Sequence, residues 1–172
     1  MYLYIRPDKV FFSSEKWVSV IKYFCEKINP YWAFFTSSED YYEVLHLLQR
    51  NWLLENNNDI DTANRIKELL LQYPEFSNLP YLDINLFSSH VDNILMVPEI
   101  RWINYWSKEI CEFNNFPDSS KAFDKQIKSI QLNSGGYIWA LTEQPWKIID
   151  PTHRQQLVQA YQRFPNIGLR LE

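Results

Sequence analysis

The chain has 172 residues, the length of one ordinary domain and enough to bury a substantial hydrophobic core. Its net charge of -4 and pI near 5.4 argue against a nucleic-acid partner, because binding phosphates requires a basic surface, and suit a basic protein instead. Only three glycines occur, which argues against the glycine-rich phosphate loops of nucleotide-binding enzymes.

The N-terminal segment, the apolar runs and the cysteines of the sequence are typical of a cytoplasmic protein. Residues 1–7 lack the basic segment and apolar core of a signal peptide, and no apolar run approaches the ~18 residues that span a bilayer. Cys25 and Cys111 lie far apart in expected helices, which favours buried free thiols over a disulfide or a zinc site.

The first third of the chain predicts two strands and a helix. Residues 1–6 alternate in the manner of a strand, and residues 31–36 form a short apolar run typical of a buried strand. Between them a helix is expected to begin at Ser13 or Ser14 and to end before Pro30. Its apolar stripe consists of Trp17, Val20, Ile21, Phe24 and Ile28.

Two further helices and another strand are expected in the middle of the chain. Ser37 or Ser38 can cap a helix whose inward stripe runs to Trp52, and Asp59 or Asp61 begins a helix that Pro74 closes. Residues 81–87 alternate with period two, which predicts a half-exposed strand.

In the last part of the chain, residues 103–113 carry apolar residues at helical spacing. Residues 117–134 predict a loop or short helix that leads into a strand near 129–133. After the turn at Gly135 and Gly136, residues 137–142 read as a central strand that is covered on both faces. Asp150 followed by Pro151 predicts a helix start, and residues 167–171 alternate as a terminal strand.

These elements predict an α+β fold, in which helices pack on a mainly antiparallel sheet of about five or six strands. Residues 1–172 are expected to form a single domain.

Catalytic patterns are absent from the sequence, and neither a cofactor nor a metal is expected. His46, His90 and His153 do not form an arrangement of metal ligands, and no nucleophile motif occurs. His153 lies in the first turn of the last helix, where a neutral capping or packing role is favoured. A small hydrolase that uses His153 with a nearby carboxylate stays open as an alternative.

The tryptophans are candidates for the core. Trp102 and Trp106 are expected on one helical face, and Trp139 and Trp146 flank the exit of the central strand. Trp146 follows a proline in an expected loop, so both a core role and a contact with a partner stay open for it.

Four segments together resemble bacterial immunity proteins, which are encoded beside polymorphic or type VI secretion toxins, including those of the Rhs kind. The segments are Trp-Ile-Asn-Tyr-Trp at 102–106, Gly-Gly-Tyr-Ile-Trp-Ala-Leu-Thr-Glu-Gln-Pro at 135–145, Asp-Pro-Thr-His at 150–153 and Tyr-Gln-Arg-Phe-Pro at 161–165. The resemblance covers residues 98–168. The first 97 residues share only the order of elements.

The resemblance implies an antidote that is not an enzyme and that binds one toxin domain in the cytoplasm to occlude its active site. A non-enzymatic adaptor domain is a further alternative, and the oligomeric state stays open. Electrostatic attraction to a basic toxin surface suggests acidic groups as partner-binding candidates, together with Trp146. The acidic candidates are Glu39, Asp40, Glu43, Glu55, Asp59 and Asp61.

Overall fold

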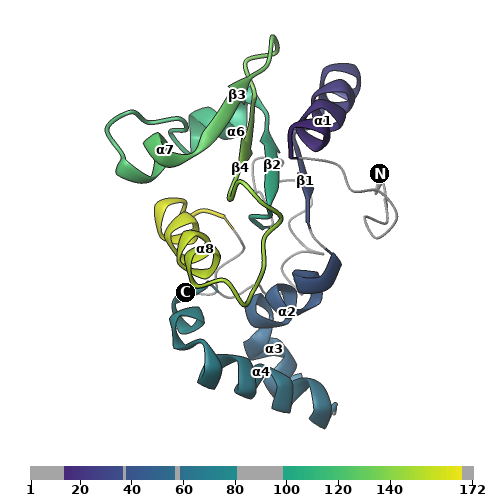
Figure 1. Ribbon diagram of the computed structural model, residues 1–172, viewed down its shortest axis with the longest axis vertical. Coiled ribbons are helices and arrows are strands. Elements are labelled where there is room, and N and C mark those ends of the chain that lie inside the picture. The colour runs from purple at the N-terminus through teal and green to yellow at the C-terminus, as the bar shows by residue number, and fades with distance from the viewer. Residues whose placement is uncertain (1–13, 37, 57–58, 81–98, 168–172) are drawn as a thin grey trace.

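The computed structural model describes residues 14–36, 38–56, 59–80 and 99–167. Their centre is an antiparallel sheet of four strands in the order β1-β2-β4-β3 (Figure 1). The expected α+β class is confirmed, with four strands in this sheet rather than five or six. The strands expected at 1–6 and 81–87 lie outside the described residues, as does nearly all of the one at 167–171. The four strands are β1 (Trp32–Phe35), β2 (Ile103–Trp106), β3 (Lys128–Gln131) and β4 (Tyr137–Ala140).

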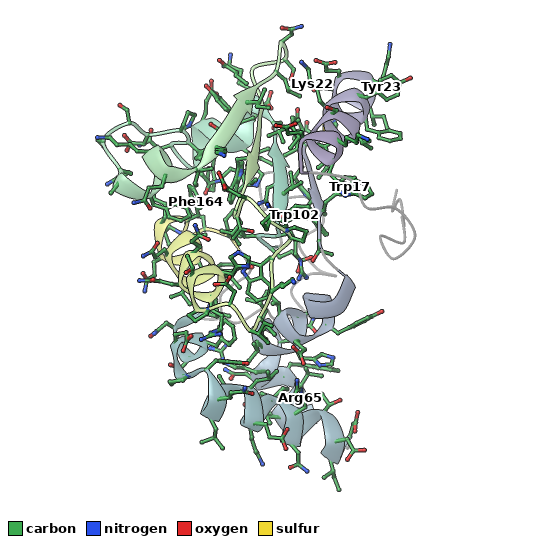
Figure 2. All side chains as sticks on the ribbon, viewed as in Figure 1. Trp17, Lys22, Tyr23, Arg65, Trp102 and Phe164 are labelled. Atoms are coloured by element: carbon green, nitrogen blue, oxygen red, sulfur yellow. The ribbon has the colours of Figure 1, made fainter. Side chains whose placement is uncertain are left out.

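Helices cover both faces of the sheet. On one face, the ring of Trp17 in α1 (Ser14–Ile28) lies 5.1 Å from that of Phe35, which is paired with Ile103 in β2. Trp106 lies three residues beyond Ile103 and therefore faces the opposite side of the sheet. There its ring is 4.8 Å from that of Phe164, the C-cap residue that follows α8 (Pro151–Arg163). Figure 2 shows Trp17 and Phe164 on opposite sides of the strands.

The core is largely aromatic on the α8 side. The ring of Trp106 also packs edge-on against those of Trp139, at 4.9 Å, and Phe116, at 5.5 Å. Trp102, Trp106 and Trp139 are all buried, which confirms their expected place in the core. The indole Nε1 of Trp102 donates a hydrogen bond of 3.0 Å to the carbonyl oxygen of Thr142.

The helix expected over 103–113 is wrong in its first half. Ile103–Trp106 is strand β2, and the helix α6 (Lys108–Phe113) begins only after Ser107, whose hydroxyl accepts a hydrogen bond from the amide of Ile110. Because β2 lies between β1 and β4 and both faces of the sheet are covered, all four of its residues are buried and their burial does not alternate. The helical spacing of apolar residues therefore predicted α6 correctly but was wrong for β2.

A second group of helices lies at one end of the molecule (Figure 1). It consists of α2 (Ser38–Leu48), α3 (Arg50–Asn56) and α4 (Ile60–Gln72), which we call the helical lobe, and the 3-10 helix η2 (Pro74–Asn78) follows it. The single helix expected up to Trp52 is divided at Gln49. Leu47 and Leu48 of α2 and Leu69 of α4 belong to the same hydrophobic cluster as the sheet.

Several local expectations are confirmed. The short helix α7 (Ala122–Gln126) leads into β3, and Asp150 caps α8 with Pro151 at its first position. Cys25 and Cys111 are free and buried. No helix within the described ranges has the length and apolar character needed to cross a membrane.

Candidate functional site

The negative charge of the chain is concentrated in the helical lobe. Residues 38–72 contain seven acidic and three basic side chains, a net charge of -4, which equals the net charge of the whole chain. The remaining 14 acidic and 14 basic residues therefore balance. Figure 1 shows this lobe at the end of the long axis away from α1 and the β3–β4 hairpin, so the chain is electrostatically polarised.

One of the three basic side chains of the lobe is not on its surface. Arg50 is buried, and its guanidinium donates hydrogen bonds to the carbonyl oxygens of Leu47, at 2.6 Å, and Leu79, at 2.7 Å. It thereby caps the end of α2 and ties the segment after η2 to the lobe. Its guanidinium is therefore not presented on the surface of the lobe.

Glu43 forms a bridge between two helices of the lobe. Its carboxylate accepts hydrogen bonds from the guanidinium of Arg65 in α4, with 3.1 Å to Nε, and this bonding raises the pKa of Arg65. Arg65 also lies 3.7 Å from Glu68. Figure 2 shows Arg65 on the lobe. The bridge holds α2 on α4, and the charge of Glu43 is largely balanced.

Asp59 has a structural role as the N-cap of α4. Its carboxylate accepts hydrogen bonds from the amides of Asp61, at 3.0 Å, and Thr62, at 3.3 Å, and from the hydroxyl of Thr62, at 2.6 Å. The hydroxyl bond is the main cause that lowers the pKa of Asp59, so the group is ionised at neutral pH. It adds a fixed negative charge to this end of the lobe.

Glu55 and Asp61 are exposed to solvent near the junction of α3 and α4. Glu39 and Asp40 lie in the first turn of α2, and their side chains are outside the described part of the structure. The structure therefore brings four of the six acidic candidates into one lobe with described side chains. Sequence reasoning missed the large exposed apolar residues of the same lobe, which are Tyr42, Leu54, Ile60 and Leu71.

Trp146 lies in the core. Only 6% of it is exposed, and its Nε1 donates a hydrogen bond of 2.9 Å to the carbonyl oxygen of His153. Of the two roles left open for Trp146, this geometry matches the core role and leaves little surface for contact with a partner.

The ring of His153 lies near the carboxylate of Asp150, and one of its nitrogens already accepts a hydrogen bond. Nδ1 of His153 accepts a hydrogen bond of 3.1 Å from the amide of Lys147, and Nε2 lies 3.7 Å from Oδ2 of Asp150. Burial lowers the pKa of His153, which favours the neutral ring. Because Nδ1 accepts the bond from Lys147, the proton of the neutral ring is on Nε2, so neither nitrogen is a free base and the arrangement fits a packing role better than catalysis.

Four arginines carry internal hydrogen bonds that the sequence did not reveal. Arg50 is one, and Arg101 forms a buried ion pair with Glu99, whose pKa burial raises. Arg154 and Arg163 pair with carboxylates from distant segments. The pairs of Arg154 and Arg163 join segments 79 and 39 residues apart, so no local sequence pattern predicts them, whereas Glu99 and Arg101 are only two residues apart. Within the described ranges, no group of three or more His, Cys, Asp or Glu side chains is arranged to hold a metal ion.

Comparison with known proteins identifies the family of the chain. Residues 54–172 match a family described as a domain of unknown function, DUF5953. Neither the curated proteins nor the solved structures contain a match to the chain. The matched region includes α4, three strands of the sheet and α8, which is more than half of the chain. The protein therefore belongs to the DUF5953 family.

Proposed function

We propose that this chain is an immunity protein that binds a cognate antibacterial toxin domain of a polymorphic or type VI secretion system, including the Rhs kind, and occludes its active site. The helical lobe is the binding surface, and the partner presents a basic surface. The observation that carries the proposal is the concentration of the net charge of -4 in residues 38–72, a lobe that also exposes four large apolar side chains.

The two properties of the lobe have separate roles in this proposal. Exposed Glu55 and Asp61, with the capped Asp59, attract a basic partner over a distance and raise the association rate. Charge alone does not give tight binding, because exposed ion pairs contribute little. Leu54 and Ile60, which are 41% and 72% exposed, supply apolar area that is removed from water in the complex.

The proposal requires a binder rather than a catalyst. Neutralising a toxin inside the cell that produces it calls for nanomolar affinity or better, which corresponds to about -12 kcal/mol. The site of action is the cytoplasm, where the toxin is made. Neither a cofactor nor a metal takes part.

The test is co-expression with the product of the adjacent upstream gene, scoring survival of the cells and co-purification of the two proteins. We expect that the neighbour alone kills and that the pair survives as a stable complex. A neighbour that is harmless alone, or a pair that does not associate, contradicts the proposal.

A double charge-reversal variant tests whether the helical lobe is the binding surface. Glu55→Lys combined with Asp61→Lys is expected to slow association by tenfold or more at low salt, with a smaller difference at high salt. Glu109→Lys combined with Glu112→Lys is the matched control, because both residues are exposed on α6 outside the lobe. Equal effects of the two double variants would place the surface elsewhere. Loss of protection on changing His153 to Ala, with the fold retained, would favour the hydrolase alternative.

A further inference from the structure

The outer face of α4 presents large apolar side chains to solvent at both of its ends. Among the described residues, Leu71 and Ile60 are the most exposed of the large apolar side chains, at 83% and 72%. Both lie on the side of the helix away from its buried residues, Ile66 and Leu69. A helix that packs on the core along one side ordinarily carries polar residues on the other, and α4 departs from this at both ends.

The residues between these two side chains complete a pattern that is the same from either end. Ile60, Asn64, Lys67 and Leu71 follow one another at intervals of four, three and four residues, so they lie on one face of the helix. Their order is apolar, polar, polar and apolar in both directions. We call these four residues the α4 stripe.

A symmetric stripe matches a second copy of itself. If a twofold axis crosses the centre of the stripe, two α4 helices run antiparallel, and Ile60 of each copy lies opposite Leu71 of the other. Both apolar ends are then covered at once, and Asn64 lies opposite Lys67. A parallel pair would instead bring the two Lys67 side chains together. Intervals of four and three residues are also those at which two helices pack along a common seam.

The charges of α4 also favour the antiparallel arrangement. The helix contains two acidic and two basic residues, so its own net charge is zero. The acidic Glu55, Asp59 and Asp61 precede it or lie in its first turn. An antiparallel pair keeps Asp59 and Asp61 of one copy more than about 13 Å along the axis from those of the other, whereas a parallel pair would bring them together. Lys67 would lie within one turn of Asp61 of the second copy.

α4 is accessible to a second copy, because it is the outermost element at its end of the molecule (Figure 1). We propose that the α4 stripe is an interface with a second copy of this chain, in which the two α4 helices pack antiparallel around a twofold axis. Two apolar side chains from each copy bury little surface, so the pair belongs to the weak, transient class of complexes.

This inference does not depend on toxin neutralisation, and it is tested on the full chain without a toxin. Ile60 belongs both to the surface proposed for the toxin and to the α4 stripe, so a bound toxin would replace the second copy. Sedimentation equilibrium, carried to millimolar protein, measures the mass in solution. We expect the mass to rise with concentration from that of the monomer towards that of the dimer. A monomer mass at every concentration overturns the proposal.

A double variant assigns the contact to α4. Ile60→Ser combined with Leu71→Ser should weaken the pair by tenfold or more, because the apolar area buried between the copies is lost. Ile130→Ser combined with Ile149→Ser is the matched control, since both residues are exposed aliphatic side chains outside the lobe. Circular dichroism confirms that the variants are folded. An equal loss in the two double variants overturns the proposal.

Disulfide trapping tests the antiparallel register. A disulfide needs Cα atoms about 4.4–6.8 Å apart, and Cys25 and Cys111 are buried, so they do not compete. A mixture of the Ile60→Cys and Leu71→Cys variants, one of them tagged, should form a mixed disulfide under mild oxidation. Each variant alone should form far less, because equivalent positions lie about 16 Å apart along the axis. Equal trapping by a single variant and by the mixture overturns the arrangement.

Discussion

Arg163, the last residue of α8, forms a two-point ion pair with Asp124 of α7. Its Nε and Nη2 donate hydrogen bonds of 3.0 and 2.8 Å to the two carboxylate oxygens, and Nη2 also bonds to the carbonyl oxygen of Asn115, at 2.8 Å. The side chain of Asp124 is 1% exposed and that of Arg163 is 14% exposed. This pair fixes the end of α8 to the connection between α6 and β3.

Replacing Arg163 by Met should lower the free energy of unfolding by about 3 kcal/mol, because it leaves a buried carboxylate without its partner. Urea denaturation measures the change. The double variant Asp124→Asn with Arg163→Met should lose less than the sum of the two single variants. Arg65→Met is the control, since the pair of Arg65 with Glu43 is more exposed and should contribute at most about 1 kcal/mol. Equal losses for Arg163→Met and Arg65→Met would contradict this reading.

Gly136 is required where the β3–β4 hairpin passes β2. A Cβ at this position would lie 2.6 Å from the carbonyl oxygen of Trp106 and 2.9 Å from the hydroxyl oxygen of Tyr105. Gly136→Ala should therefore lower the free energy of unfolding by about 2 kcal/mol or more, since the main chain of a central strand must move. Thermal unfolding provides the measurement. Asn133→Ala changes an exposed residue of the same turn and should have little effect.

The two thiols should be unreactive in the folded protein. Cys25 and Cys111 are 2% and 3% exposed, and burial raises the pKa of each to about 12. The thiolate is the reactive form, so it is scarce at pH 8 and also shielded from reagents. Titration with a chromogenic disulfide reagent should detect both thiols in guanidinium chloride and almost no reactive thiol in its absence. Rapid reaction of either thiol under native conditions would show that its helix opens easily.

His153 should make the protein less stable in mild acid. Burial lowers its folded pKa below the ordinary value of 6.5, so the unfolded chain binds more protons as the pH falls. This contribution to stability is complete above pH 6.5 and is lost as the pH falls through 6.5 towards the folded pKa. NMR titration of His153 measures that pKa directly. The negative charge of Asp150 raises it, so Asp150→Asn should lower it further.

A matching pair of urea titrations at pH 7.5 and 5.5 tests the consequence for stability. His153→Asn keeps an acceptor for the amide of Lys147 but does not titrate, so its stability should change less between the two conditions. An identical pH dependence in the wild type and in this variant would show that other groups cause the change.

Local signals in the sequence predicted the starts of α4 and α8 correctly. Asp59 and Asp150 cap α4 and α8 as expected, because an N-cap depends on residues within one turn. β2 was mistaken for helix, because a short apolar run buried on both faces has no period of its own. The division between α2 and α3 at Gln49 could not be predicted, since Arg50 is bonded to carbonyl oxygens some 30 residues away.

In the candidate site, too, features set by neighbouring residues could be predicted from the sequence, and features set by tertiary contacts could not. That acidic residues cluster between Glu39 and Asp61 is evident in the sequence. Glu43 is hydrogen-bonded to Arg65, 22 residues away, so its negative charge is largely balanced. This pairing depends on how α2 packs on α4. The pairing of Glu75 with Arg154 joins segments 79 residues apart, and no local sequence pattern predicts it.

The pairing of β1 with β2 has a consequence for expressing parts of this chain. The family match begins at residue 54, whereas β1 lies at Trp32–Phe35 and is paired along the full length of β2. A fragment that starts at the family boundary would turn β2 into an open edge and would remove the Trp17 side of the core, so it should aggregate rather than fold. The region matched by the family is thus shorter than the part of the chain that builds the sheet.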